Sequence, residues 1–411
     1  MVLNYIWLAF FLIGFFVALG KWMIEGDLAV FPAIVDSLHA LAKVSVEISL
    51  GLIGVMALWL GFMKIGERGG AIDVLTRLVS PFFRRLFPEI PSGHPAMGSM
   101  VMNFAANMLG LDNAATPLGL KAMAQLQELN VEKDRASNAQ IMFLVLNTSG
   151  LTIIPVSVIA LRVAQGAANP TDIFIPILVA TFASTLCGLL VVSTIQRINL
   201  FQPVVLGYLL GGMGLIGGML WYFTRLEPDA MAAQSQFLGA FIICGIIFGF
   251  LSLAMVRQVN VYEAFIDGAK EGFEVAVKII PYLVAMLVAI GVFRKSGAMG
   301  LLLDAVRWVA SPFGDTRWVD ALPVALMKPL SGSGARGAAV ETMETFGPDS
   351  FAGTLACTMQ GSTETTFYTL AVYFGSVAIV RTRYTIVAGL IADVVGILAA
   401  IFVAYLFFGS R

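Results

Sequence analysis

The chain has 411 residues, of which 58% are hydrophobic and 12% are charged, and its mean hydropathy is +0.87. Because soluble globular proteins carry about 25% charged residues, this composition excludes an ordinary soluble domain. The formal net charge of −1 argues against nucleic acid as a partner. Several windows of about 20 apolar residues have the length of a membrane crossing, so we predict an all-α, polytopic protein embedded in a lipid bilayer.

About nine full crossings are predicted in chain order: 3–22, 45–64, 138–162, 173–195, 203–223, 236–256, 275–293, 352–379 and 384–408. The first segment lacks a basic start and a small-residue cleavage site, and we interpret it as a retained helix. Lysine and arginine are more frequent in the loops on the side of the N-terminus, which predicts that the N-terminus is cytoplasmic.

Two further apolar stretches, 96–127 and 319–346, do not fit a single crossing. Each is interrupted centrally by polar residues and glycines, the first at Asn113–Gly119 and the second at Ser331–Gly337. The arms on either side have about 12 to 17 residues, which is short for a crossing. We therefore predict two re-entrant hairpins, which enter and leave the membrane on the same side.

The chain repeats itself weakly. The segment "AKVSVE" (42–47) matches "AKEGFE" (269–274), and "GGAIDVLTRLVSPF" (69–82) matches "SGAMGLLLDAVRWVASPF" (296–313) with an insertion. Each copy is followed by a hairpin, a crossing interrupted by polar residues and a closing crossing. Because two helices join the copies, the second copy starts on the opposite face, and inverted repeats of this kind are typical of secondary transporters. The alternative is a duplicated structural domain without transport.

Polar residues interrupt the hairpins and two crossings at paired positions, and we predict that they bind a substrate. The candidates are Asn113 and Thr116, then Asn147, Thr148 and Ser149, then Ser331 and Ser333, and finally Gln360, Ser362, Thr363 and Glu364. Unwound backbone and hydroxyl oxygens are suitable cation ligands, so Thr148, Thr152, Thr363 and Thr366 are candidate Na+ ligands. The alternative is that these side chains bond back to their own helix or join neighbouring helices.

Three acidic residues, Glu364, Asp393 and Asp112, are candidates for proton or ion coupling, because an acid within a membrane segment is usually functional. For Glu364 the alternative is a structural ion pair with Lys328 or Arg336.

No cofactor is predicted apart from a coupling Na+ or H+, and the cysteine spacing matches no metal site. The two histidines, His39 and His94, lie in loop-like stretches, and "SGSGARG" does not match the G-x-S-x-G pattern of serine hydrolases. No H-E-x-x-H pattern occurs either, so we do not expect an enzyme.

Several long motifs resemble a known family. The motifs "LWLGFMKIGERGG", "LFPEIPSGHPAMG", "LDNAATPLGLKAM" and "VLNTSGLTIIPVSVIALR" resemble spore maturation protein A. The second half resembles spore maturation protein B, in "KPLSGSGARG", "FGPDSFAGTLACTMQGSTETTFYTLAVYFG" and "GLIADVVGI". Both groups carry the nucleoside-recognition, or Gate, domain, which is distantly similar to concentrative nucleoside transporters.

The resemblance implies a fusion of two Gate repeats, 1–198 and 236–411, joined by 199–235 with its extra helix 203–223. It also implies that the hairpin tips and broken helices form the binding site. The middle of the first tip, Ala114 and Ala115, lacks the acidic residue of the nucleoside transporters.

We expect a transporter of a small polar solute, such as a nucleoside-like molecule, an amino acid, a dipeptide or a cell-wall fragment, coupled to Na+ or H+ and operating by alternating access. The alternative is a membrane scaffold or a regulator of envelope, peptidoglycan or spore maturation processes. A homo-oligomer is compatible with either function.

Overall fold

The computed structural model describes residues 2–110, 112–226 and 228–409, and these residues form seventeen α-helices. Their only β pairing is one bridge between Arg135 and Arg381. The first half contains α1 (Val2–Gly20), α2 (Val30–Gly69), α3 (Ala71–Leu86), α4 (Pro95–Met108), α5 (Asp112–Leu129), α6 (Asn138–Ser149), α7 (Val156–Ala164), α8 (Phe174–Gln196) and α9 (Pro203–Phe223). The second half contains α10 (Pro228–Val256), α11 (Val261–Lys295), α12 (Ala298–Ala310), α13 (Leu322–Met327), α14 (Gly332–Phe346), α15 (Phe351–Gly361), α16 (Thr366–Ser376) and α17 (Thr385–Phe408).

Six helices in the described residues are long and apolar enough to cross a membrane, and a seventh crossing is possible if a bent pair counts as one. The six lie within α1 and its π-helical extension (Lys21–Glu25), α2, α8, α9, α10 and α17. The bent pair joins the end of α11 to α12 at an angle of 72°. The chain is therefore a multi-pass helical membrane protein, as the composition predicts.

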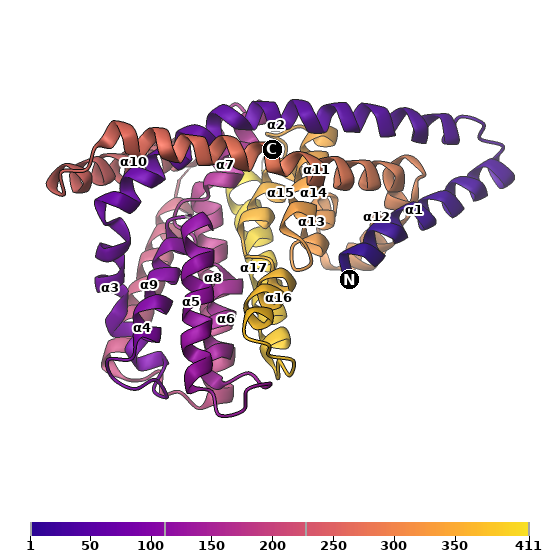
Figure 1. Cartoon of the computed structure of the whole chain (residues 1–411). Coiled ribbons are helices and arrows are strands. Elements are labelled where there is room, and N and C mark those ends of the chain that lie inside the picture. Colours follow the sequence, from indigo (N-terminus) through magenta and orange to yellow (C-terminus); the bar gives the residue numbers. More distant parts are fainter. Residues whose placement is uncertain (1, 111, 227, 410–411) are drawn as a thin grey trace.

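The helices α2 and α11 form the most extensive helix–helix contact among the described residues and lie side by side along one edge of the molecule (Figure 1). Their 40 and 35 residues exceed the predicted crossings 45–64 and 275–293, because polar and charged turns extend each helix beyond its apolar window. Close packing depends on two glycines four residues apart in α11. A Cβ atom on Gly268 would lie 2.2 Å from the carbonyl oxygen of Leu60, and one on Gly272 would lie 2.6 Å from the backbone of Met56. Small residues at this spacing let two membrane helices approach closely.

Both long helices end in the same way. Gly70 follows α2 with a φ of 85°, and Gly297 follows α11 with a φ of 90°. A positive φ is costly for residues with a Cβ atom, so glycine at these positions allows the sharp turn into α3 and α12.

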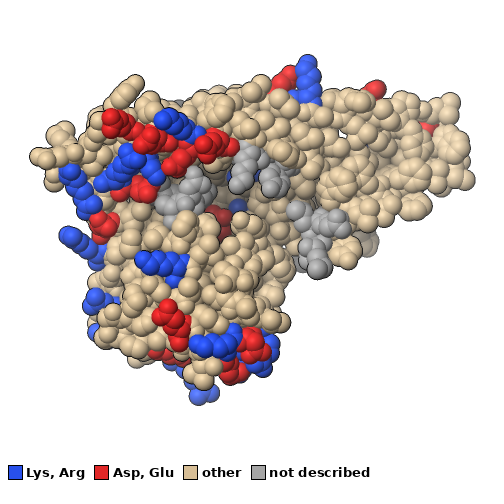
Figure 2. All heavy atoms as spheres, in the orientation of Figure 1, with Lys and Arg blue, Asp and Glu red and all other residues tan. Residues whose placement is uncertain are grey.

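The surface separates charged from uncharged regions. Figure 2 shows that most charged side chains of this face gather on its left half and at its lower end, whereas the right-hand part is almost free of charge. Large apolar side chains such as Phe237, Phe241 and Phe248 of α10 are exposed. Apolar surface of this extent suits contact with lipid rather than water.

Candidate functional site

The site is built from two helical hairpins and two interrupted helices. The hairpin α4–α5 turns after Leu109 and Gly110, and the hairpin α13–α14 turns at residues 328–331. The helix pair α6–α7 is interrupted at 150–155, and the pair α15–α16 is interrupted at 362–365. The sequence predicted an interruption in each of these four segments, but it placed the hairpin turns too late in the chain. The predicted break Asn113–Gly119 lies inside α5, and most of Ser331–Gly337 lies inside α14, because these polar and small residues form the first turns of the outgoing helices, with Ser331 as the N-cap of α14.

Each hairpin tip is hydrogen-bonded to the interruption in its own half of the chain. The backbone N–H of Ile153 donates to the carbonyl of Met108 at 2.8 Å, and the N–H of Phe367 donates to the carbonyl of Pro329 at 2.9 Å. A carbonyl at the end of a hairpin arm thus gains a donor, from the unwound segment in the case of Ile153 and from the first turn of α16 in the case of Phe367, as a buried backbone requires.

The two interruptions also contact each other. The N–H of Glu364 donates to the carbonyl of Thr148 at 2.8 Å. Gly150 has a φ of 56°, and a Cβ atom there would lie 2.9 Å from Cγ of Glu364. Glycine is therefore needed where the two interruptions meet, both because it allows this backbone angle and because it is small.

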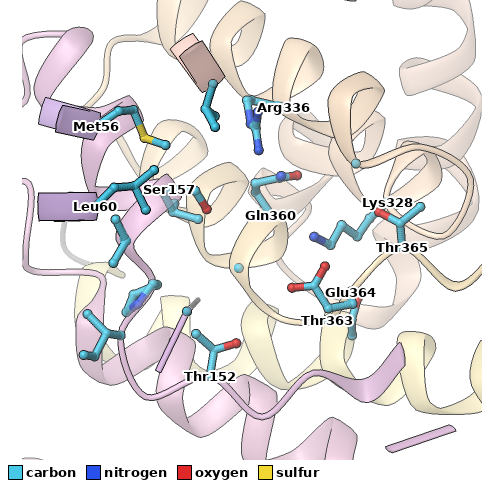
Figure 3. A pocket seen from close by; sticks show the side chains of 18 residues that line it. Met56, Leu60, Thr152, Ser157, Lys328, Arg336, Gln360, Thr363, Glu364 and Thr365 are labelled. Carbon is cyan, nitrogen blue, oxygen red and sulfur yellow. The ribbon is translucent and has the colours of Figure 1, made fainter. Parts of the chain in front are cut away.

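Two adjoining cavities open between the tips and the interruptions. The larger has a volume of about 550 Å³, the smaller has about 130 Å³, and Gly332, Arg336, Glu364 and Thr365 line both. Figure 3 shows Lys328 extending toward the carboxylate of Glu364, with Arg336 and Gln360 on another wall of the smaller cavity. Acidic and basic groups thus face the same space within a largely apolar protein.

The structure brings eight of the predicted site residues to these walls. Thr116, Asn147, Ser331 and Ser333 line the larger cavity, Thr152, Gln360 and Thr363 line the smaller one, and Glu364 lines both. The Ser331 hydroxyl lies 3.2 Å from that of Ser333 and also caps α14 by accepting a bond from the N–H of Gly334.

The remaining described candidates lie behind the cavity walls. Thr148, Ser149 and Ser362 donate their hydroxyl groups to carbonyls of the preceding helical turn, as the alternative interpretation of such residues expects. Thr366 donates to the carboxylate of Asp393 at 2.7 Å. The side chains of Asp112 and Asn113 lie outside the described residues, so the predictions for them stay predictions.

Among the cavity residues that were not predicted from the sequence are Asn107, Tyr368 and Tyr373. Asn107 donates to the amide oxygen of Asn147 at 2.9 Å, which joins the first hairpin to the first interruption. The sequence could have indicated this contact, because Asn103 and Asn107 lie four residues apart in an apolar arm. An amide side chain inside a membrane needs a hydrogen-bond partner. The two tyrosines gave no signal, since aromatic residues are common in apolar helices.

A buried ion pair joins the two halves beside the site. Arg162 of α7 is completely buried and donates to the carbonyl of Pro348 at 2.6 Å and to the carboxylate of Asp349 at 2.9 Å. A second carboxylate, that of Asp172, lies 3.1 Å from the same guanidinium group. One planar guanidinium group thereby holds three segments together.

Two hairpins and two interrupted helices around two adjoining cavities define a multi-pass helical membrane protein with a candidate site between its two halves. The sequence profile of the Gate family, described as nucleoside recognition, matches residues 49–165 and 276–380, and the chain belongs to this family. The chain is 42% identical to spore maturation protein A of Bacillus subtilis (strain 168) over 191 residues, which are 46% of this chain and 93% of that protein. It is also 46% identical to spore maturation protein B of the same organism over 165 residues, which are 40% of this chain and 92% of that protein.

Proposed function

We propose that the chain is a secondary transporter of a small polar solute, located in a bacterial inner membrane with its N-terminus in the cytoplasm. The observation that carries this proposal is the convergence of two hairpins and two interrupted helices on two adjoining cavities lined in part by polar residues. Interruptions of a membrane helix are tolerated where they line a cavity, and they serve as binding sites in transporters. No enzymatic role is proposed.

An inverted repeat is supported by the packing of α2 against α11. The alignment of Ala42–Glu47 with Ala269–Glu274 also pairs Leu41 with Gly268 and Lys64 with Gly291. Close contacts occur between Gly291 and Leu41 and between Gly268 and Lys64. Exchanging the two repeats converts each of these contacts into the other, as a twofold relation requires.

We propose nine crossings plus two re-entrant hairpins. Seven crossings correspond to the six long helices and the bent pair, and the other two correspond to α6–α7 and α15–α16, whose halves are each too short to cross alone. We further propose that residues 1–198 and 236–411 are the two repeats and that 199–235 connects them, in line with the lengths over which the two spore maturation proteins match.

The chemistry of the cavity favours a solute that carries an anionic group. Arg336 and Lys328 supply positive charge, and Gly332, the first residue of α14, lines both cavities, so the positive end of this helix dipole borders the same space. Glu364 and the hydroxyl groups of Ser331 and Ser333 accept hydrogen bonds from the rest of the solute. Among the solutes considered, amino acids, dipeptides and cell-wall fragments carry a carboxylate, whereas nucleosides do not.

In the proposed alternating access, the hairpin tips separate from the interruptions on one side of the membrane at a time. Each separation opens the cavity to that side. A coupling ion, Na+ or H+, supplies the driving force. A scaffold or regulator of envelope or spore maturation processes needs no cavity of solute size, and a cavity of about 550 Å³ therefore favours transport over that alternative.

A ligand-stabilisation screen tests the proposed binding site. Purified protein is heated with amino acids, dipeptides, muropeptide fragments and nucleosides, and the melting temperature is recorded. We expect a carboxylate-bearing solute to stabilise the protein, by about 2.7 kcal/mol at a concentration of 100 Kd. Its amidated analogue and the Arg336→Gln variant should show little stabilisation. Equal stabilisation of the wild type and of Arg336→Gln would contradict the predicted site.

A further inference from the structure

Behind the smaller cavity, α17 carries a buried carboxylate with an unsatisfied oxygen. Asp393 is 1% exposed, and its Oδ2 accepts the hydroxyl of Thr366 at 2.7 Å. Its Oδ1 has no hydrogen-bond partner within the described residues. A carboxylate oxygen buried without a partner is energetically costly, which points to a ligand at this atom.

A second unsatisfied oxygen lies in the adjoining interruption. Thr363 is 2% exposed, and its Oγ1 forms no hydrogen bond of standard geometry in the part of the chain that the structure describes, although it lies near enough to interact with the carboxylate of Asp393. Thr363 packs directly on α17, because a Cβ atom on Gly396 would lie 2.6 Å from its Cγ2. Two buried oxygens without a hydrogen bond of standard geometry thus belong to neighbouring segments.

Glycines on α17 bring the interruption close to this carboxylate. Gly389 and Gly396 lie one helical turn before and after Asp393, so all three occupy one face of the helix. A Cβ atom on Gly389 would lie 2.9 Å from Cγ2 of Thr366, and one on Gly396 would lie 3.2 Å from the carbonyl oxygen of Ser362. This face therefore gathers carboxylate, hydroxyl and carbonyl oxygens at short range.

The electrostatics favour a cation at this place. The helices α6 and α15 both end at the interruptions, and the C-terminal end of a helix carries partial negative charge. Lys328 and Glu364 lie near enough to interact with the charge of Asp393, and Arg336 lines the adjoining cavity. The formal charges of these four residues cancel, so an anionic solute and one monovalent cation can bind together without leaving net charge in the membrane.

We infer that Asp393, Thr363 and Thr366, with backbone carbonyls of the interruption at 362–365, form a Na+ site. Hard oxygen donors of this kind suit Na+, and transporters use unwound carbonyls in the same way. The inference rests on the proposed transport function and identifies the site of the coupling ion. Because Thr363 lines the smaller cavity, a cation bound here borders the wall that faces the solute.

Na+-dependent stabilisation of the purified protein, measured without solute, tests the site. Melting temperatures are recorded in NaCl, KCl and choline chloride at equal ionic strength and constant pH. We expect a saturable rise in NaCl and a smaller one or none in KCl. Asp393→Asn and Thr363→Val should each weaken the apparent Na+ affinity by about 10- to 100-fold, the range seen when a supporting residue of a metal site is removed.

Ser184→Ala is the matched control. Its hydroxyl donates to the carbonyl of Ala392 at 2.9 Å and packs near Gly396, but it belongs to α8 and has a partner already. This variant should keep the Na+ response of the wild type. If Asp393→Asn does not fold, Thr363→Val still decides the question, because it replaces a hydroxyl with a methyl group of nearly the same size.

The possible outcomes separate this inference from the proposed function. A wild-type protein that responds equally to NaCl, KCl and choline chloride overturns the Na+ site. A response to pH alone, lost in Asp393→Asn, also overturns it and assigns a proton to the carboxylate. Solute binding without a Na+ response leaves the transporter proposal standing, whereas a Na+ response with no solute binding supports the site and counts against the transporter.

Discussion

Replacing Arg162 with methionine is expected to lower the free energy of unfolding by about 3–5 kcal/mol, the cost of removing one partner from a buried ion pair. The guanidinium group is fully buried, and so is most of Asp172, whose side chain is only 6% exposed. Without the arginine this carboxylate keeps its burial but loses its nearest positive charge, and the carbonyl of Pro348 loses a donor. Chemical unfolding in mild detergent, followed by tryptophan fluorescence, measures the change.

The matched control is Arg381→Met, which removes an ion pair of similar length on the surface. Arg381 lies 2.7 Å from Asp134, and both side chains are more than half exposed. The hydrogen bond from Arg381 lowers the pKa of Asp134, so the pair is formed at neutral pH. Exposed pairs contribute little to stability, and this variant should unfold almost like the wild type. Equal losses in the two variants would contradict the role assigned to Arg162.

Glu364→Gln and Asn147→Ala are expected to reduce gradient-driven uptake of the solute by at least about tenfold. A hydrogen bond to a charged group contributes about 1.5–3 kcal/mol, and each 1.4 kcal/mol corresponds to a factor of ten. Glu364→Gln keeps the backbone bond to Thr148, and its side chain faces the cavity, so the fold should persist. Asn147→Ala removes the acceptor of Asn107 and with it the link between hairpin and interruption.

Uptake into proteoliposomes is measured alongside gel filtration, which reports folding. Glu344→Gln is the control, since Glu344 is an exposed residue of α14 that lines neither cavity. It should transport like the wild type. Normal uptake by both Glu364→Gln and Asn147→Ala would exclude the two residues from the transport site.

The interruptions could be predicted from the sequence because their residue types are incompatible with a regular membrane helix. Pro155 cannot donate a backbone hydrogen bond, and Gly150 allows a positive φ, so "NTSGLTIIP" indicates a break whatever surrounds it. The same local chemistry identified "LSGSGARG" and "QGSTETT". The apolar windows also placed most of the long helices, although they missed how far α2 and α11 extend.

The arrangement of the site could not be predicted, because it depends on contacts between distant segments. Thr148 and Thr363 look alike in the sequence, yet Thr148 bonds back to Val145 whereas Thr363 lines a cavity. Glu364 was predicted as an acid within a membrane segment, and the structure places its side chain exposed in the cavity wall. The packing of the two halves decides whether a polar side chain bonds to its own helix, bonds to another segment or lines a cavity.

A reversible cross-link between the second hairpin tip and its interruption tests the central claim that these elements must separate for transport. A Cβ atom on Gly332 would lie 4.0 Å from Cβ of Thr365, within the 3.5–4.5 Å range of disulfides. The double variant Gly332→Cys and Thr365→Cys is made after Cys187, Cys244 and Cys357 are replaced by alanine, with each single variant as a control. We predict that oxidation abolishes solute uptake into proteoliposomes, that reduction restores it, and that the single variants respond to neither. Undiminished uptake with the cross-link fully formed would contradict the account.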